Sequence, residues 1–207
     1  MPQIPNSSSE KRSDVMLFHL VLAALFGALS YVVFAFMRVD INIGLVKTSF
    51  HAANTIVVLC PLFAAAPFGL LGPALGLFLS DVFTGYAHVA AETFILKFLM
   101  ALITYSCYKR LQKSSLAGNT LSDKHRFFNA SLSMGAGLLF NLVFAPISSY
   151  LYHRYLLGVN TDAAKIFIKI TSGVVLFNAI LSLVLGVILY IALYKALSNS
   201  KLKNLFK

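Results

Sequence analysis

The residues of this sequence that could do chemistry are polar side chains set inside or beside long apolar blocks. His51 and Asn54 are three positions apart, a spacing that places both on one face of a helix. Asp81 ends one apolar block, and Glu92 and Lys97 lie near the start of the next. Such side chains are costly inside a bilayer, so each calls for a partner, a cavity or a ligand. We expect these five residues to contribute to a polar binding site.

Further polar residues come from later apolar blocks and from one loop. Asn141 and Tyr152 fall on one helical stripe, and Asn178 lies in the last apolar block. A loop between two blocks adds Tyr86 for stacking and His88 for hydrogen bonding. Polar stripes at one depth on several helices suggest a shared cavity for a flat, polar small molecule. We therefore add these five residues to the predicted substrate site.

The same residue types also have plain structural uses. Tyrosine and histidine at a membrane edge are typical interfacial anchors, and asparagines within spans can hydrogen-bond between helices. Asp81 and Lys97 could neutralise each other as an ion pair, which would not prevent ligand contact. The sequence leaves these readings open beside the cavity.

Small residues gather in the first apolar block. Ala24 and Ala28 are one helical turn apart, and Gly27 lies beside them. This spacing lets a second helix approach closely, whether it belongs to the same chain or to a separate subunit. We expect Ala24, Gly27 and Ala28 to form a docking face for a partner.

Motifs for catalysis are absent from the sequence. It has no phosphate-binding glycine loop ending in Lys-Ser/Thr, no His-Glu-x-x-His and no metal-ligand spacing, which predicts a non-catalytic protein without cofactor or metal. ATP-driven work would need another subunit. The net charge of +10 does not predict nucleic-acid binding, because the basic residues lie at the edges of apolar blocks.

The composition belongs to the membrane class. Of the 207 residues, 58% are hydrophobic and 12% are charged, against roughly 25% charged in soluble domains, and the mean hydropathy is +0.80. A spanning helix needs about 20 apolar residues, so we predict an all-α integral membrane fold with six transmembrane helices. The predicted spans are 16–37, 49–65, 67–83, 92–108, 130–152 and 170–194.

Three regions and an orientation follow from these spans. Residues 1–15 form an N-terminal tail, 16–195 the membrane domain and 196–207 a basic C-terminal tail. Six spans put both termini on one side of the membrane. That side carries eleven Lys and Arg residues and the other side six, so both termini are predicted to be cytoplasmic. The predicted substrate site then faces outward. The eleven residues are Lys11, Arg12, Lys109, Arg110, Lys113, Lys124, Arg126, Lys195, Lys201, Lys203 and Lys207.

The stretch 68–103, FGLLGPALGLFLSDVFTGYAHVAAETFILKFLMALI, resembles a known family. Its glycine-rich helix, the Leu-Ser-Asp ending at Asp81, the turn 84–86 and the segment 93–97 are similar to substrate-binding S components of energy-coupling factor (ECF) vitamin transporters. Ala24 and Ala28 resemble the alanine motif with which S components dock on a transmembrane T subunit. The resemblance is loose over most of the chain and more specific over 68–103.

The resemblance implies a transport role in the plasma membrane of a bacterium. An S component binds a vitamin from outside, docks on the T subunit, which two ABC-type ATPases drive, and topples to release its cargo inside. The substrate could be hydroxymethylpyrimidine, pyridoxine, riboflavin, pantothenate or cobalamin, and we favour a small pyrimidine or pyridine. Two alternatives remain: a stand-alone secondary transporter, and a membrane scaffold protein without a small-molecule site.

Overall fold

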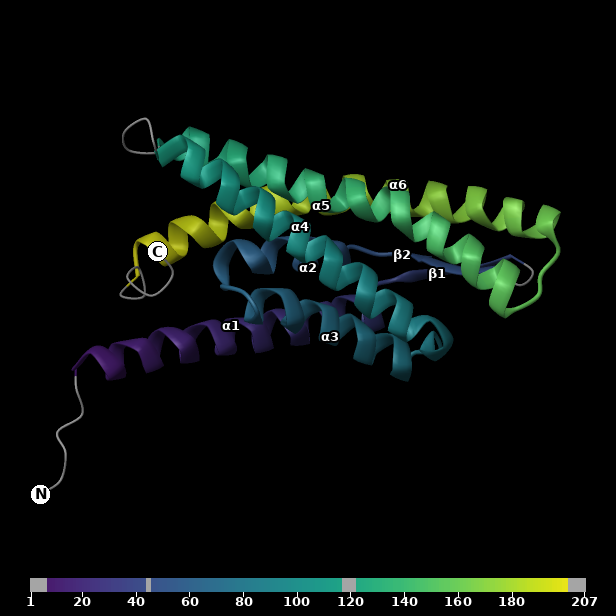
Figure 1. Ribbon diagram of the computed structural model, residues 1–207, viewed down its shortest axis with the longest axis horizontal. Coiled ribbons are helices and arrows are strands. Elements are labelled where there is room, and N and C mark those ends of the chain that lie inside the picture. The colour runs from purple at the N-terminus through teal and green to yellow at the C-terminus, as the bar shows by residue number, and fades with distance from the viewer. Residues whose placement is uncertain (1–6, 44–45, 117–121, 201–207) are drawn as a thin grey trace, which may run out of the picture.

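A computed structural model describes residues 7–43, 46–116 and 122–200 as an elongated helical bundle with one β-hairpin (Figure 1). The chain runs back and forth along the long axis, so α1 begins and α6 ends at one end, whereas the hairpin and the α5–α6 connection lie at the other. The bounds are α1 Ser7–Phe36, β1 Val39–Ile43, β2 Val46–Phe50, α2 Ala53–Phe63, α3 Phe68–Phe83, the 3-10 helix η1 Ala87–Val89, α4 Ala90–Leu116, α5 Asp123–Leu151, the π-helical turn η2 Tyr152–Leu156 and α6 Thr161–Ser198.

The long helices confirm a helical membrane protein. In the described part of the chain, four segments are long and apolar enough to cross a membrane. They are Arg12–Phe36, Ala87–Ser115, Asp123–Leu156 and Thr161–Ser198. The apolar helices α2 and α3 have 11 and 16 residues, fewer than the roughly 20 that a full crossing needs. The six-span count and the cytoplasmic termini therefore stay predictions.

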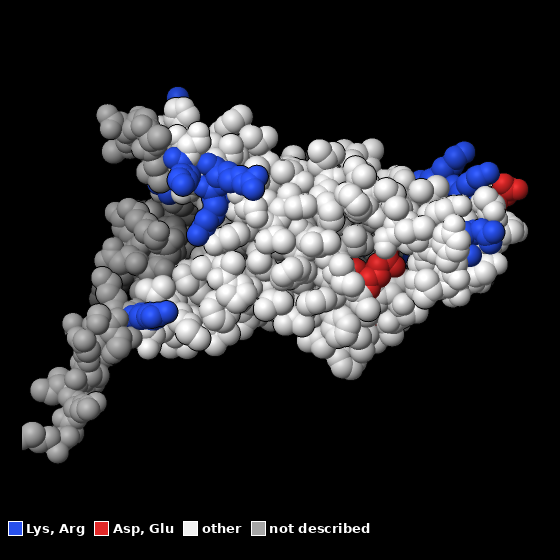
Figure 2. Space-filling view, viewed as in Figure 1, with Lys and Arg blue, Asp and Glu red and all other residues white. Residues whose placement is uncertain are grey.

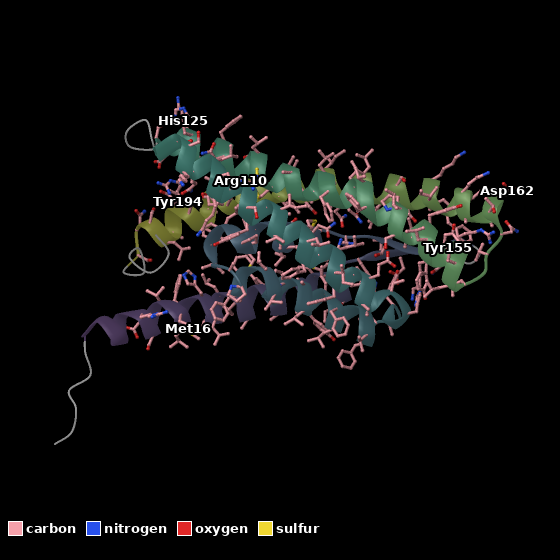
Figure 3. All side chains as sticks on the ribbon, viewed as in Figure 1. Met16, Arg110, His125, Tyr155, Asp162 and Tyr194 are labelled. Carbon is pink, nitrogen blue, oxygen red and sulfur yellow. The ribbon has the colours of Figure 1, made fainter. Side chains whose placement is uncertain are left out.

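Charged side chains gather at the two ends of the bundle. On the face seen in Figure 2, Lys and Arg atoms lie near both ends, and the surface between them is uncharged apart from one acidic patch. The labelled side chains in Figure 3 follow the same axis, with Arg110, His125 and Tyr194 near one end and Tyr155 and Asp162 near the other. An uncharged middle between two charged ends suits a protein embedded in lipid.

The β-hairpin was not predicted from the sequence. Residues 38–42 were expected to form a loop and Ser49 to begin a helix, but β1 and β2 pair antiparallel, with Val39 opposite Phe50 and Ile41 opposite Thr48. Apolar and polar residues alternate along β1, a period that fits a strand with one face turned inward. The prediction that the second helix starts at Ser49 was wrong by four residues, because that segment completes β2.

Two predicted loops turned out to be partly helical. The segment 109–129 was expected to be a polar loop, but α4 continues to Leu116 and α5 begins at Asp123. The segment 153–169 was also expected to be a loop, yet α6 begins at Thr161. Asn160 caps this helix, because its Oδ1 accepts a hydrogen bond from the Ala163 N–H at 2.8 Å.

Helices α1 and α3 pack backbone to backbone through small residues. A Cβ added to Gly27 would lie 2.8 Å from the Gly72 carbonyl oxygen, and one added to Gly76 would collide with the Gly27 carbonyl oxygen. The Ser30 hydroxyl crosses the same contact and donates to the Pro73 carbonyl oxygen at 3.1 Å. Glycine is required here because a larger side chain would hold the helices apart.

Helix α2 forms the centre of the bundle. Every one of its residues is buried, and it packs against α1, α3, α4, α5 and α6. Apart from Asn54 and Thr55 in its first turn, the helix has no polar side chain except the thiol of Cys60, which suits a fully buried position. Its first turn presents Asn54 at the hairpin end of the bundle.

The α1–α3 contact yields a test of the fold. Gly76→Ala should lower the free energy of unfolding by about 1–3 kcal/mol, because the new methyl group overpacks the contact with α1. The midpoint of thermal unfolding in detergent measures the effect. The matched control is Gly135→Ala on α5, where an added Cβ meets nothing within 4 Å and stability should stay equal or rise. Equal midpoints for the two variants would contradict the packing described here.

Candidate functional site

A cavity of about 200 Å³ lies at the hairpin end of the bundle. Its walls come from the hairpin, from the α3–α4 connection, from α2 to α6 and from η2. Pockets that hold drug-sized ligands measure about 300–1,000 Å³, so this cavity suits a compact ligand. Its polar lining residues outside the predicted set are Lys47, Thr48, Ser49, Thr93, Ser149, His153 and Thr171.

The structure brings all ten predicted substrate residues to the wall of this one cavity. They come from the hairpin end, α2 to α6, the α3–α4 turn and η2. That they bind a substrate stays a prediction. The ten are His51, Asn54, Asp81, Tyr86, His88, Glu92, Lys97, Asn141, Tyr152 and Asn178.

Six of these residues are at most 9% exposed, and four of the six come from α2, α3, α4 and α5, one from each helix. The exposed fractions are 2% for Asn54, 2% for Asp81, 9% for Lys97 and 1% for Asn141. Lys97 Nζ donates a hydrogen bond of 2.8 Å to Asn141 Oδ1 and so joins α4 to α5. Asn54 Oδ1 and Asp81 Oδ2 are buried and accept no hydrogen bond within the described part of the chain. The cavity lining therefore combines a lysine that donates one hydrogen bond with two acceptors that have none among the described residues.

Asp81 and Lys97 do not form the ion pair that the sequence left open as an alternative. Ion pairs closer than 4.0 Å among the described residues are Arg38–Asp40 and Lys165–Asp162, both elsewhere. Lys97 instead bonds to the neutral amide of Asn141. Asp81 and Lys97 thus line the cavity as two separate charges.

Asn178 holds the hairpin against α6. Its Oδ1 accepts the backbone N–H of His51 at 3.0 Å, and its Nδ2 donates to the Ser49 carbonyl oxygen at 3.0 Å. The His51 ring packs edge-on against Phe34, with centroids 4.9 Å apart. Because both ends of the Asn178 amide are engaged, Asn178 shapes the cavity by positioning the end of β2.

A second set of contacts ties the hairpin to the α3–α4 turn. Tyr86 donates its hydroxyl proton to Asp40 at 2.8 Å, and Arg38 Nε donates to the same carboxylate at 2.7 Å. Arg38 also donates to the Thr84 hydroxyl at 2.7 Å, and Lys47 Nζ donates to the Gly85 carbonyl oxygen at 3.1 Å. We call Arg38, Asp40, Lys47, Thr84 and Tyr86 the hairpin latch. It fixes one wall of the cavity.

The charges of the latch change two ionisation equilibria outside the spans. Burial alone would raise the pKa of Asp40, but hydrogen bonds from Arg38 and Tyr86 and the nearby cations outweigh it and lower that pKa. Burial, together with the hydrogen bond to the Asp40 carboxylate, raises the pKa of Tyr86. Asp40 is therefore an anion and Tyr86 a neutral donor at neutral pH.

Lys47, Thr48 and Ser49 were missed as lining residues because the hairpin was missed. The available signal was the alternation of apolar and polar residues along β1. Phe34 adds an aromatic wall that no polar pattern would reveal. On the far side, the His88 and Tyr152 rings approach with centroids 6.0 Å apart, from positions 64 residues apart in sequence.

The three predicted docking residues do not share one face. Ala24 and Ala28 lie on the exposed side of α1, whereas Gly27 is buried against Gly72 of α3. Including Gly27 in an outward docking face was wrong, because its small size serves the contact inside the chain. Leu17, Leu25 and Leu29 are also exposed on α1.

Metal binding has no support among the residues that the structure describes. These residues contain no group of three or more His, Cys, Asp and Glu side chains that could hold a metal ion. The polar groups of the cavity are suited to hydrogen bonds with an organic molecule.

Comparison with protein-family models finds a match for most of the chain. A family model described as "ECF-type riboflavin transporter, S component" matches residues 15–195 of the chain. No curated protein and no solved structure matches. The match includes α2 to α5 and every residue that lines the cavity, together with most of α1 and α6.

The hairpin latch can be tested by hydrogen exchange. Tyr86→Phe removes the hydroxyl that donates to Asp40, and such a bond is worth about 1.5–3 kcal/mol when the acceptor is charged. Amide exchange in peptides that cover 39–50 should therefore become faster. Tyr155→Phe is the control, because Tyr155 is 73% exposed in η2 and the exchange of the hairpin should not change. Unchanged exchange in Tyr86→Phe would show that the latch does not hold the hairpin.

Proposed function

Because the chain belongs to the family of ECF-type riboflavin transporter S components, we propose that its cavity captures one small heteroaromatic vitamin for import. The observation that carries this proposal is the convergence of polar residues from five helices and the hairpin on a single cavity in an otherwise apolar bundle. Buried polar groups are costly without partners. A ligand that hydrogen-bonds to them offsets this cost.

The position of the cavity supports capture from outside the cell. The cavity lies at the end of the bundle away from the start of α1 and the end of α6. The excess of Lys and Arg on the side of the termini favours a cytoplasmic location for that side, eleven against six. With that orientation the cavity faces the exterior of a bacterial plasma membrane.

The size and lining of the cavity favour a compact, flat substrate. A volume of about 200 Å³ is too small for cobalamin. The rings of Phe34, Tyr86, His88 and Tyr152 can pack on a planar heterocycle, and the sequence has no tryptophan. Pyrimidine and pyridine vitamins fit this description. Riboflavin is named by the matching family and is the first probe to use.

Release inside the cell is assigned to partners. The sequence has no phosphate-binding glycine loop, so ATP hydrolysis is assigned to two ABC-type ATPases acting through a T subunit. Ala24 and Ala28 on the exposed side of α1 offer a smooth surface for close helix approach. We assign T-subunit docking to this face.

Vitamin binding should need neither partners nor ATP. The Asn54→Leu variant removes a buried oxygen that has no hydrogen-bond partner among the described residues, so the ligand-free protein should stay as stable or become more stable. If Asn54 contacts the vitamin, affinity should fall about 3- to 10-fold. Isothermal titration with riboflavin, hydroxymethylpyrimidine and pyridoxine, paired with thermal unfolding, measures both effects. A scaffold protein would bind none of the three.

Docking and binding should be separable. Ala24→Leu/Ala28→Leu should reduce uptake by the complete transporter in vesicles more than tenfold, because bulky side chains hold the T subunit away. Binding by the purified subunit should not change. The matched control is Ala192→Leu/Ala196→Leu, which has the same spacing of exposed alanines on α6 and should leave uptake intact. Uptake that persists without any ATPase would instead identify a secondary transporter.

A further inference from the structure

Asp81 and Lys97 carry opposite charges into the same cavity without meeting. Both are buried, at 2% and 9% exposure, and both line the wall. No ion pair within 4.0 Å joins them in the described part of the chain. A purely structural pair would close to direct contact, since two separated buried charges each bear a desolvation cost.

The hydrogen-bonding capacity on the two sides is complementary. A lysine ammonium has three N–H donors, and Lys97 Nζ donates one of them to Asn141 Oδ1. Asp81 Oδ2 is buried and accepts no hydrogen bond from the described residues. Asn54 also lines the cavity, and its Oδ1 is likewise buried and accepts no hydrogen bond from the described residues. The lining of the cavity therefore offers one strong donor and two acceptors without a partner among the described residues.

The formal charges of the lining cancel. Lys47 and Lys97 are its lysines, and Asp81 and Glu92 are its carboxylates. An anionic ligand would leave a carboxylate of the lining without compensation, and a cationic ligand would do the same to a lysine. Either mismatch is expensive in a buried site.

We propose that Asp81 and Lys97 together recognise a neutral heterocycle by hydrogen-bonding to adjacent groups on one edge of its ring. A ring nitrogen or carbonyl oxygen of the ligand accepts from Lys97, and an adjacent N–H or amino group donates to Asp81, with Asn54 as the second acceptor. Lactam and aminopyrimidine edges carry this pair of groups. Carboxylate vitamins such as pantothenate are disfavoured. This inference rests on the proposed function and specifies the substrate class of the same cavity.

The test uses ligands that differ by a methyl group on the donor nitrogen. Riboflavin is compared with 3-methylriboflavin, and 4-amino-5-hydroxymethyl-2-methylpyrimidine with its 4-dimethylamino derivative, by isothermal titration on the purified full chain. A hydrogen bond to a charged group is worth about 1.5–3 kcal/mol, so the parent that binds should bind about 10- to 100-fold tighter than its methylated form. Pantothenate should bind more weakly than that parent.

Two variants assign the discrimination to the proposed residues. Asp81→Asn should shrink the ratio between parent and methylated ligand, because a neutral amide accepts more weakly than a carboxylate. Asp162→Asn is the matched control, since Asp162 lies outside the cavity lining and its side chain is 91% exposed, and it should keep the ratio. If Asp81→Asn does not fold, the comparison of parent and methylated ligands on the unmodified chain still tests whether the ligand's N–H group donates a hydrogen bond.

Several results would overturn the inference. Equal affinity for a parent and its methylated form would show that the protein does not accept a hydrogen bond from the ligand's N–H group. If pantothenate bound most tightly, the balanced charges of the lining would not select a neutral ligand. Both results leave vitamin capture intact. Failure of every neutral heterocycle to bind also overturns the inference. The proposed function fails with it only if no vitamin of any charge binds.

Discussion

The hydrogen bond from Lys97 Nζ to Asn141 Oδ1 joins α4 to α5 at the wall of the cavity. A lysine that is 9% exposed in an apolar bundle needs such a partner, because an isolated buried ammonium is strongly disfavoured. Asn141 meets part of that need but brings no opposing charge. The charge of Lys97 is therefore not neutralised by an ion pair within the described part of the chain, and the lining keeps polar groups that can bind a ligand.

The remaining contacts divide the molecule into a polar end and packed apolar layers. Asn178 and the hairpin latch fix the hairpin over the cavity at one end. The glycines of α1 and α3 bring these two helices into backbone contact, which turns Gly27 inward and leaves Ala24 and Ala28 on the outside. Binding and docking can therefore use different surfaces of one chain. The hairpin latch and the proposed docking face are both linked to α1, since Arg38 of the latch lies two residues after the end of that helix.

The sequence predicted the cavity better than the elements that enclose it. Asn54, Lys97 and Asn141 were recognisable because polar residues in apolar blocks are rare and costly, and in the structure all three line the cavity. The hairpin was missed because its strands have five residues each and follow directly after a long apolar block. The pairing of Asp81 with Lys97 could not be decided from spacing, because it depends on how far α3 and α4 separate at that level. Gly27 was misplaced for a related reason: small residues at one turn of a helix fit an internal neighbour as well as a separate subunit.

The central claim is that this cavity holds a small neutral vitamin when the subunit is alone. The most direct measurement is mass spectrometry of the small molecules released by denaturing the purified protein, with their amounts compared with that of the chain. The account predicts one neutral heteroaromatic vitamin, at close to one equivalent, in the absence of ATP and of any partner. Repeated preparations that release no vitamin, or that release a carboxylate vitamin, would contradict it.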